Sequence, residues 1–498
     1  GDTRPVRVVT EEEIRGTCNR LLLNGINTIT SYYSFNGLEP DQLRRLNTWI
    51  GRCSTALWGG HQVADIALVY PVESVWAKFL PARRGSTDSP EARLIESAYR
   101  GAGDSLFGSC RDFTYVDSQA LGESKVDAGA LTHGKLRWRV VVLPAVDTLP
   151  AAVWEKLAEF WRTGGVVVAL DALPANSETE FPSARVQALG REIFGEARSA
   201  ADAFVPRSRT NAAGGVGIYL PAGTRALLPT VLNAVLEPDV AAGGKSPIRG
   251  THRSIDGNEV YFVINDSGAP FEGDVTVTGA GAGKLWNPAT GESTRLTSGA
   301  VKLSLEPYGG AILRFPSART PERRKLDSTA GFELSLRSIP AVEPTAGRGE
   351  FVSAEVTKTA DGGWRSVGTL TKSDVDTFLF MNFLYPKPID LSAGTGLYVR
   401  TSVPAGQTTP SNLLVILEDA DGGQYLADCG RPLSIAGDRA AVVAFSQLRL
   451  AGWSKDTTGQ LDLDRIVRVS VGWGGYFGKE KEKVEFTVQL PQLCLLPK

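Results

Sequence analysis

A short segment near the start of the chain brings together side chains that commonly do chemistry. Residues 24–37 read NGINTITSYYSFNG, and a glutamate follows at position 39. The β-branched and aromatic run is typical of a buried strand, and in α/β enzymes the carboxyl end of such a strand usually carries functional groups. The candidates are the phenols, the amide and the carboxylate at its end: Tyr32, Tyr33, Asn36 and, as a weak catalytic candidate, Glu39.

Two predicted helices flank this strand. In residues 10–24, Thr10 and Glu13 form a capping box, and apolar residues follow at helical spacing. A second amphipathic helix is predicted over residues 41–58. The strand predicted over residues 26–35 therefore lies between two helices without a sheet partner. Such a unit cannot bury both of its faces alone, so we expect it to need chain from elsewhere.

The next part of the chain alternates strands and helices. Its strands are continuous runs of Val, Ile and Leu, which indicates a parallel sheet covered on both faces, in a flavodoxin-like layout. No glycine-rich phosphate loop follows these runs, so a nucleotide site is not supported. The strands are predicted over residues 64–71, 137–146, 166–171 and 215–221, and the helices over about 90–101, 151–165 and 223–236.

Beyond about residue 245 the helical periodicity stops. Short apolar runs separated by turn residues, up to residue 316, predict a small β-sandwich. Residues 317–330 are charged and lack apolar periodicity, which is typical of a linker. Residues 331–498 are again rich in alternating strand patterns, and their turn spacing predicts a jelly roll.

The composition excludes several classes of protein. The chain has 498 residues, of which 42% are hydrophobic and 22% charged, with a net charge of −2. Nothing here indicates a nucleic-acid or membrane partner. The five cysteines form no CxxC pair and there are only three histidines, so a zinc site is not expected. Cys18 and Cys53 are expected as buried free thiols, Cys429 and Cys494 could pair, and the histidines are expected to be structural.

The order of these elements resembles a known family. The stretch RCSTALWGGHQVADIALVYPVESVW (52–76) resembles the segment that leaves the catalytic barrel in multidomain glycoside hydrolases of the α-L-rhamnosidase-like group. The stretch LRWRVVVLPAVDTLPAAVWEKLAEFWRTGGVVVALDALP (136–174) resembles the flavodoxin-like domain that follows the barrel there and in some β-galactosidases. VYFVINDS (260–267) with KLWNPATGE (284–292) resembles the next β-sandwich, and residues 444–473 are similar to jelly-roll carbohydrate-binding modules.

The resemblance implies a multidomain α/β plus β fold. Residues 1–60 would be the last βα units of a (β/α)8 barrel, and residues 61–240 a flavodoxin-like domain. A small β-sandwich at 245–316, a linker at 317–330 and a jelly roll at 331–498 would follow. The two catalytic carboxylates of such enzymes would lie on earlier barrel strands, which would precede Gly1. We therefore expect an upstream portion or a polypeptide partner to supply them and complete the barrel.

The same resemblance turns the aromatic residues into candidate sugar contacts, because an aromatic ring stacks well on a sugar face. Core packing is the alternative for each ring, and helix capping is the alternative for Glu39. Glu73 and Trp76 follow the strand at 64–71 and could face the barrel mouth, with interdomain packing as their alternative. The candidates are Tyr32, Tyr33, Asn36, Glu73 and Trp76 for substrate, and Trp453, Tyr476 and Phe477 for glycan binding in the jelly roll.

No cofactor is expected, apart from a structural Ca²⁺ that such jelly rolls often carry. Its candidate oxygen ligands are Glu418, Asp419, Asp421, Asp462 and Asp464, without EF-hand spacing. The expected partners are a carbohydrate, the polypeptide that completes the barrel and, as an open alternative, further copies of the chain. The sequence does not fix a cellular location; a secreted or periplasmic one is slightly favoured.

We therefore expect the C-terminal part or subunit of a glycoside hydrolase that acts on a plant or microbial glycan or glycoside, with an α-L-rhamnoside as one candidate substrate. The alternative is a non-catalytic carbohydrate-binding or scaffold protein. A glutamine-amidotransferase-like enzyme is disfavoured because Cys110 lacks a nucleophile elbow. The sugar, the linkage and the stereochemical course remain open.

Overall fold

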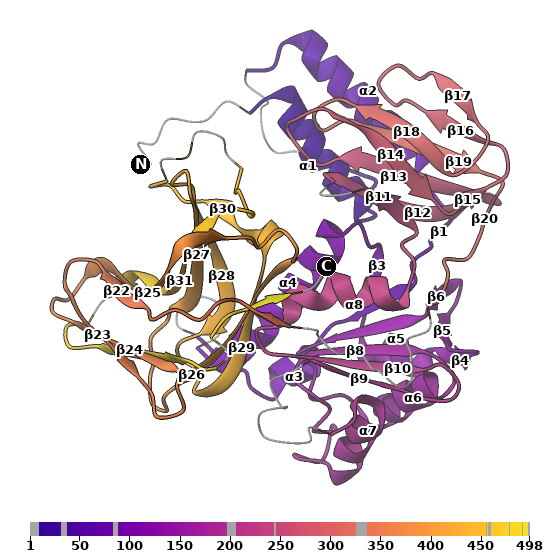
Figure 1. The fold of residues 1–498 in the computed structure, drawn as a ribbon. Coiled ribbons are helices and arrows are strands. Elements are labelled where there is room, and N and C mark those ends of the chain that lie inside the picture. Colours follow the sequence, from indigo (N-terminus) through magenta and orange to yellow (C-terminus); the bar gives the residue numbers. More distant parts are fainter. Residues whose placement is uncertain are drawn as a thin grey trace.

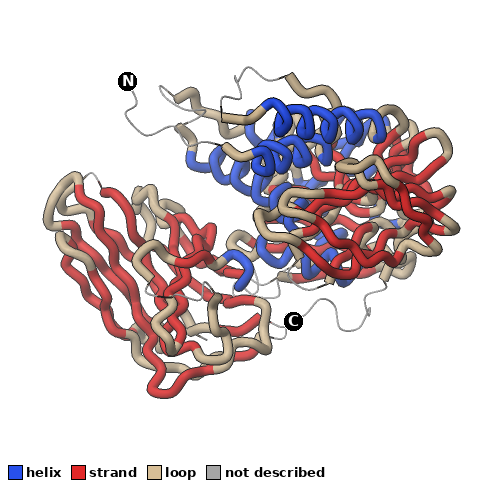
Figure 2. Tube along the Cα trace, turned by 90° about the horizontal axis from the view of Figure 1, so that it is seen from above, coloured by secondary structure: helices blue, strands red, loops and turns tan. Residues whose placement is uncertain are grey.

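The computed structural model of the chain is mixed α/β with much sheet. Figure 1 shows a first β-sandwich with an N-terminal helix pair, a sheet flanked by helices, and a C-terminal β-sandwich. Seen from above in Figure 2, the C-terminal sandwich consists of strands and loops, and most helices belong to the other two parts. The structure describes residues 9–30, 37–82, 88–196, 206–243, 246–324, 336–454, 456, 460–477, 479–490 and 492–496.

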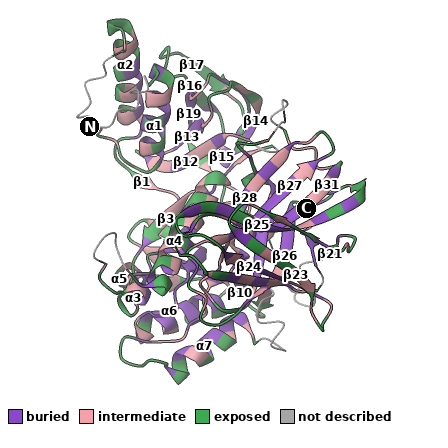
Figure 3. Ribbon diagram, turned by 90° about the vertical axis from the view of Figure 1, so that its left-hand side faces the viewer, coloured by how far each residue is buried: buried purple, intermediate pink, exposed green. Residues whose placement is uncertain are grey.

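The N-terminal helices are α1 (Glu11–Leu23) and α2 (Pro40–Ala56). The predicted capping box of α1 is confirmed: the Glu13 backbone N–H donates to Thr10 Oγ1 at 3.2 Å, and the Thr10 N–H donates to Glu13 Oε2 at 3.1 Å. The helices contact each other, and their apolar faces cover the outer side of the first sandwich, where Trp49 packs in one core with Phe262 and Ile312. Figure 3 shows exposed residues along the opposite side of α2.

The strand predicted between these helices is wrong for its described part. Residues 26–30 form no strand, and the chain there pairs with no described neighbour. A strand persists only where its backbone groups find partners in an adjacent strand, so β-branched composition alone was insufficient. Residues 31–36 lie outside the described part of the chain.

The central part is a six-stranded sheet in the order β3-β2-β7-β8-β10-β9. The first five of these strands run parallel, as predicted, and β9 pairs antiparallel at one edge. Counted along the chain, the parallel strands take the order 2-1-3-4-5. The bounds are β2 (Ile66–Val69), β3 (Phe113–Val116), β7 (Val140–Pro144), β8 (Val166–Asp171), β9 (Arg207–Thr210) and β10 (Val216–Pro221).

Helices cover both faces of this sheet because its strands are apolar on both sides. One face, with Val142 and Val168, packs against α4 and α8; the other, with Val141 and Val167, packs against α5, α6 and α7. The bounds are α3 (Val72–Trp76), α4 (Pro90–Gly108), α5 (Ser118–Glu123), α6 (Ala151–Arg162), α7 (Ala184–Phe194), η2 (Arg225–Leu227) and α8 (Leu228–Val235), with a small sheet of β4 (Lys125–Asp127), β5 (Ala130–His133) and β6 (Leu136–Trp138).

The first sandwich packs a six-stranded sheet, β1-β12-β13-β19-β16-β17, on a three-stranded sheet, β11-β14-β18. Part of the predicted linker is folded: β20 pairs with β15, and Arg319 forms an ion pair with Glu237. The bounds are β1 (His61–Gln62), β11 (Val240–Ala242), β12 (Ile248–Ile255), β13 (Asn258–Asn265), β14 (Phe271–Val277), β15 (Gly279–Ala280), β16 (Gly283–Trp286), β17 (Ser293–Leu296), β18 (Ala300–Leu305), β19 (Gly310–Phe315) and β20 (Ser317–Ala318).

The C-terminal sandwich packs the path β21-β33-β26-β32-β24-β23, with β29 paired to β26, on a sheet in the order β22-β25-β31-β27-β28-β30. Its core holds Phe383, Trp473 and Phe486. The bounds are β21 (Arg337–Ser338), β22 (Thr345–Arg348), β23 (Val352–Lys358), β24 (Trp364–Leu370), β25 (Val375–Ile389), β26 (Gly396–Val403), β27 (Asn412–Asp419), β28 (Gln424–Pro432), β29 (Gly437–Ala444), η3 (Phe445–Gln447), β30 (Arg449–Leu450), β31 (Ile466–Phe477), β32 (Lys483–Val488) and β33 (Cys494–Leu496).

The C-terminal sandwich and the parallel sheet share one hydrophobic core. Tyr398, Val442 and Leu496 of the sandwich pack in the same cluster as the sheet and α8. At this contact the Val442 N–H donates to the Gly223 carbonyl at 2.6 Å. A Cβ atom on Gly223 would overlap the carbonyl oxygen of Ala440, and φ there is +86°. The contact therefore requires glycine at this position.

All five cysteines are free, so Cys429 and Cys494 do not pair. Cys18 and Cys53 are buried, as predicted. Within the described residues, no helix combines the length and the apolar character that a membrane crossing requires.

Candidate functional site

The N-terminal candidates are only partly described. Tyr32, Tyr33 and Asn36 lie outside the described residues. Glu39 is the N-cap residue of α2, where its backbone N–H donates to Gln42 Oε1 at 2.8 Å. The capping role that was the alternative for Glu39 is thus the one that the structure shows.

The catalytic carboxylates are expected upstream of Gly1, and the structure does not test this expectation. Gly1 and the residues that follow it, up to residue 8, are outside the described part. Glu39 is the N-cap residue of α2, and a catalytic role for its carboxylate stays a prediction. The carboxylates expected upstream of Gly1 stay a prediction.

A cavity of about 1010 Å³ that sequence reasoning did not find lies beside this region, between α1, α2 and the turn that holds Tyr308. Its polar groups are largely engaged with each other. Arg45 forms an ion pair with Glu11 at 2.7 Å. Arg15 donates to the carbonyls of Pro307 at 2.7 Å and Tyr308 at 3.2 Å. The lining residues therefore join the two helices to the first sandwich.

The loop after β2 places its two candidates differently. Ser118 Oγ donates a short hydrogen bond to Glu73 Oε1, so this carboxylate faces α5. The neighbouring Ser74 is buried, and its Oγ accepts from the backbone N–H groups of Asp147 at 3.1 Å and Thr148 at 3.0 Å. Ser74 thus ties together the loops after β2 and β7, where ligands of open α/β sheets usually bind. Only Trp76, 71% exposed, projects to solvent.

The aromatic candidates of the C-terminal sandwich also divide. Trp453 is 59% exposed and donates from Nε1 to Gln424 Oε1 at 2.8 Å, and Tyr476 is 66% exposed. Phe477 is 2% exposed and packs edge-on against Trp473 at 4.8 Å between ring centroids. For Phe477 the alternative of core packing is the one that the structure shows, because β31 continues through residue 477 and alternation turns its ring into the core.

Two further rings lie on the outer face of the same sheet, and sequence reasoning missed them. Phe378 and Phe380 of β25 have centroids 6.0 Å apart. Phe378 lies opposite Gly474 of β31, and Phe380 lies opposite Gly472. A Cβ atom added at Gly474 would come within 3.2 Å of Phe378 Cβ, and one added at Gly472 within 2.7 Å of Phe380 Cδ1. The signal was present, because Phe378 and Phe380 alternate with the core residues of TFLFMNFLYP.

Three of the five acidic residues proposed as calcium ligands have protein partners for their carboxylates. Glu418 pairs with Arg468, and Asp421 pairs with Arg465 at 3.0 Å. Asp419 Oδ1 accepts from the Gly423 N–H at 2.7 Å. Within the described residues, no group of three or more His, Cys, Asp or Glu side chains converges as a metal site would require.

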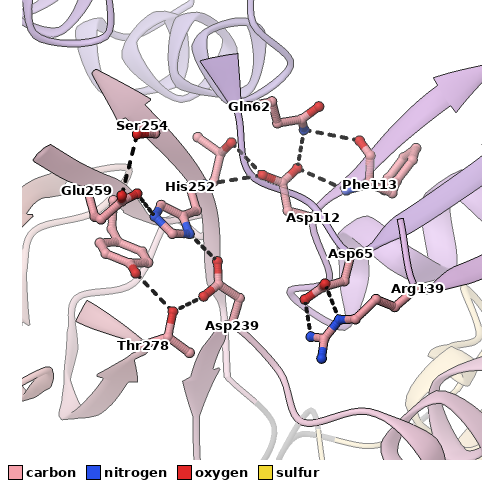
Figure 4. A network of polar contacts seen from close by, with 12 residues as sticks. Gln62, Asp65, Asp112, Phe113, Arg139, Asp239, His252, Ser254, Glu259 and Thr278 are labelled. Carbon is pink, nitrogen blue, oxygen red and sulfur yellow. Dashed lines mark hydrogen bonds and ion pairs between the residues drawn. The ribbon is translucent and has the colours of Figure 1, made fainter. Parts of the chain in front are cut away.

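A connected polar cluster that the sequence did not indicate surrounds His252. Figure 4 shows the His252 ring between two carboxylates, with Asp239 Oδ2 2.7 Å from Nδ1 and Glu259 Oε2 2.9 Å from Nε2. The ring is 2% exposed and stacks on Tyr261 at 4.0 Å. Burial alone would lower the pKa of His252, but the hydrogen bonds and charges of Asp239 and Glu259 outweigh it and raise the pKa above 6.5.

Asp112 extends this network to the parallel sheet. Its oxygens accept from Gln62 Nε2 at 2.8 Å, Thr251 Oγ1 at 2.6 Å and the His252 N–H at 3.2 Å. Burial raises the pKa of Asp112 to about 6 despite these hydrogen bonds. The carboxylates of the cluster already have hydrogen-bond partners within the protein. The cluster therefore places charged groups at the junction between the first sandwich and the parallel sheet. His252 thus has the partners expected of a structural histidine, with Asp239 and Glu259 only 13 and 7 positions away along the chain.

Comparison with known proteins gives a family match. A family model described as alpha-L-rhamnosidase matches residues 24–298. No curated protein matches the chain. Among solved structures, a rhamnosidase from Novosphingobium sp. PP1Y is similar at 13% identity and a TM-score of 0.41, covering 96% of this chain and 46% of that one. Gan42B, a GH42 beta-galactosidase from G. stearothermophilus, is similar at 12% identity and a TM-score of 0.41, covering 62% and 51%.

A family 11 carbohydrate-binding module of a Clostridium thermocellum cellulase is similar at 15% identity and a TM-score of 0.25, covering 33% of this chain and 94% of the module. The chain spans about half the length of the rhamnosidase and the beta-galactosidase. The family match confirms the resemblance stated from residues 52–76 and 136–174 at the level of the family.

Proposed function

Because the chain belongs to the alpha-L-rhamnosidase family of glycoside hydrolases, we propose that it is the C-terminal part or a subunit of an enzyme that hydrolyses α-L-rhamnosides in a plant or microbial glycan or glycoside. The single observation that carries this proposal is the match over residues 24–298, from the end of α1 to the loop after β17. The catalytic carboxylates would come from chain upstream of Gly1 or from a partner.

The proposed architecture assigns a role to each part. The sheet order 2-1-3-4-5 supports a flavodoxin-like domain, and the two C-terminal sheets support a jelly-roll-like module. The helices α1 and α2 would be the last helices of a (β/α)8 barrel. Three apolar residues of these helices, Ile14, Leu21 and Leu43, are only half-buried and do not belong to the core that the helices form with the first sandwich. They could therefore pack against the rest of a barrel, which supports this role.

We propose that the C-terminal sandwich binds glycan through the rings on the outer side of its β25–β31–β28 sheet. Exposed Trp453, Tyr476 and Phe378 support this role, because each can stack on a sugar face. The amide of Gln424 fixes the Trp453 indole at 2.8 Å. Substitution of Trp453 by Ala should reduce retardation in glycan-containing native gels, whereas Trp58→Ala, equally exposed on the first sandwich side, should not.

Hydrolysis is tested with aryl glycosides. The chain together with its upstream portion or partner should release 4-nitrophenol from the α-L-rhamnoside and not from the β-D-galactoside. Hydrolysis of the galactoside alone would refute the substrate assignment. An assembled protein that hydrolyses neither but still binds glycan would favour the second candidate, a non-catalytic carbohydrate-binding scaffold, which the exposed rings of the C-terminal sandwich support.

A further inference from the structure

A small cavity separate from the glycan-binding rings lies where the parallel sheet meets the C-terminal sandwich. It has a volume of about 220 Å³. On one side it is lined by residues that follow the carboxyl ends of parallel strands, including Ala145 after β7, Asp171 at the end of β8 and Ala222 after β10. On the other side it is lined by residues of β28 and β29, including Arg431 and Arg439.

The lining carries more positive than negative charge. Four cationic side chains and three carboxylates surround the cavity. Lys78 pairs with Asp147, and Arg225 Nε lies 3.3 Å from Asp171 Oδ2. The third carboxylate, Glu91, is exposed at the start of α4, where it accepts from Ser89 Oγ at 3.2 Å. Two guanidinium groups therefore remain without a carboxylate partner.

These two guanidinium groups differ in their surroundings. Arg431 is buried and donates to backbone carbonyls, with Nη1 2.7 Å from the Ile435 oxygen and Nη2 2.8 Å from the Gly437 oxygen. Its charge is hydrogen-bonded but not neutralised. The guanidinium of Arg439 makes no hydrogen bond or ion pair with any residue that the structure describes. A half-buried cation without a partner is unfavourable, so an anion would be stabilised here.

Asp171 adds a second, independent feature. Its Oδ1 atom is buried and accepts no hydrogen bond from the described residues. Its backbone has φ of +64°, in the left-handed region that non-glycine residues seldom adopt. Burial also raises the pKa of this carboxyl group, despite the charges of Arg225 and Arg439. An unsatisfied buried acceptor beside an unpaired cation suits a ligand that carries both a hydroxyl donor and a negative charge.

We propose that this cavity binds a small hydroxycarboxylate, whose carboxylate pairs with Arg439 and whose hydroxyl donates to Asp171. A volume of about 220 Å³ limits the ligand to a small molecule. Planar carboxylates suit guanidinium groups, which present parallel N–H donors. The site draws residues from both the parallel sheet and the C-terminal sandwich, and it is independent of the proposed hydrolysis.

The test is calorimetric titration of the whole chain with D-glycerate, acetate, glycerol and inorganic phosphate. D-glycerate should bind about ten-fold more tightly than acetate, which lacks the hydroxyl, or glycerol, which lacks the charge. Arg439→Gln should weaken glycerate binding by about ten-fold, the loss expected for one charge-assisted hydrogen bond. The control Arg295→Gln removes an exposed arginine on β17 and should leave the affinity unchanged.

A second variant separates the two contacts. Asp171→Asn should reduce the preference for glycerate over acetate, and it keeps the test open if Arg439→Gln fails to fold. Unchanged melting temperatures of the variants would show that the losses are local. Tighter binding of phosphate than of glycerate, equal binding of acetate and glycerate, or no binding of any probe would each overturn the proposal.

Discussion

Replacement of His252 by Gln tests the charge cluster that joins the first sandwich to the parallel sheet. The substitution removes a cation held between two carboxylates at 2.7 and 2.9 Å. Breaking a buried ion pair from one side costs about 3–5 kcal/mol, because the remaining charge is left uncompensated. We expect the full loss only where His252 is protonated in the native protein.

The sign of the pH dependence follows from the direction of the pKa shift. The folded-state pKa of His252 is raised above 6.5, so its contribution to stability is complete below pH 6.5 and disappears as pH rises through the folded value. At pH 5 the variant should lose about 3 kcal/mol. As pH rises toward 9 and the native ring loses its proton, the loss should fall toward about 1 kcal/mol, because a neutral ring donates only one hydrogen bond.

Asp112 also makes the native protein more stable at lower pH. Its pKa rises from 3.8 to about 6 on folding, so the folded state binds more protons between these values. At about 1.36 kcal/mol per pH unit, the native protein should lose at most about 3 kcal/mol between pH 4 and pH 7. The first sandwich should therefore be most stable at acid pH, with respect to these two groups.

The assay is hydrogen exchange of peptides from β12 and β13, corrected for the intrinsic pH dependence of exchange and converted to free energies of opening. His133→Gln is the matched control, because His133 stacks on Trp138 at 6.5 Å outside the cluster; it should change the opening of these strands by less than about 0.5 kcal/mol. A loss in the His252 variant that is equal at pH 5 and pH 9, or larger at pH 9, would refute the reasoning.

Three further predictions concern packing. Gly223→Ala should lower the melting temperature far more than Gly406→Ala, with a loss above about 3 kcal/mol against about 1, because both glycines have positive φ but only Gly223 meets the backbone of Ala440; equal shifts would contradict this contact. Ser74→Ala should cost about 1–3 kcal/mol, measured by urea unfolding, because two backbone N–H groups lose their acceptor; Ser105→Ala on α4 is a control with no expected effect. The free cysteines should react with a thiol reagent only after denaturation, because burial raises the pKa of Cys53 to about 12; fewer than five thiols in denaturant would indicate a disulfide.

Local sequence signals predicted the elements that depend on local rules. The capping box at Thr10 and the continuous apolar runs of the parallel strands specify their own structure, since caps and binary patterns act over a few residues. The run at residues 26–30 has the composition of a strand, but pairing depends on a neighbour that composition does not reveal. Family membership was also visible, because residues 52–76 and 136–174, which carried the resemblance, lie within the stretch that the family model matches.

The site was harder to predict than the elements. Phe477 was a glycan-binding candidate because glycines precede it in GWGGYF, but the pairing of β31 with β25 continues through Phe477, opposite Val375, and buries its ring. His252 looked isolated because Asp239 and Glu259, 13 and 7 positions away, follow no spacing that marks a site, and Glu259 reaches the ring only across the β12–β13 hairpin. Arg439 and Asp171 are 268 positions apart and meet only at the contact between two domains. Sequence periodicity therefore does not reveal which charged groups meet when they are far apart along the chain.

The core shared by the parallel sheet and the C-terminal sandwich has a consequence for modularity. Domains of multidomain proteins are often treated as detachable units that can be moved between chains. Here, cutting the chain before β21 would expose Tyr398, Val442 and Leu496 to water on one fragment and the surface of α8 on the other. Both fragments would then expose apolar faces that favour aggregation. The two domains should therefore be expressed and exchanged together, as a single unit.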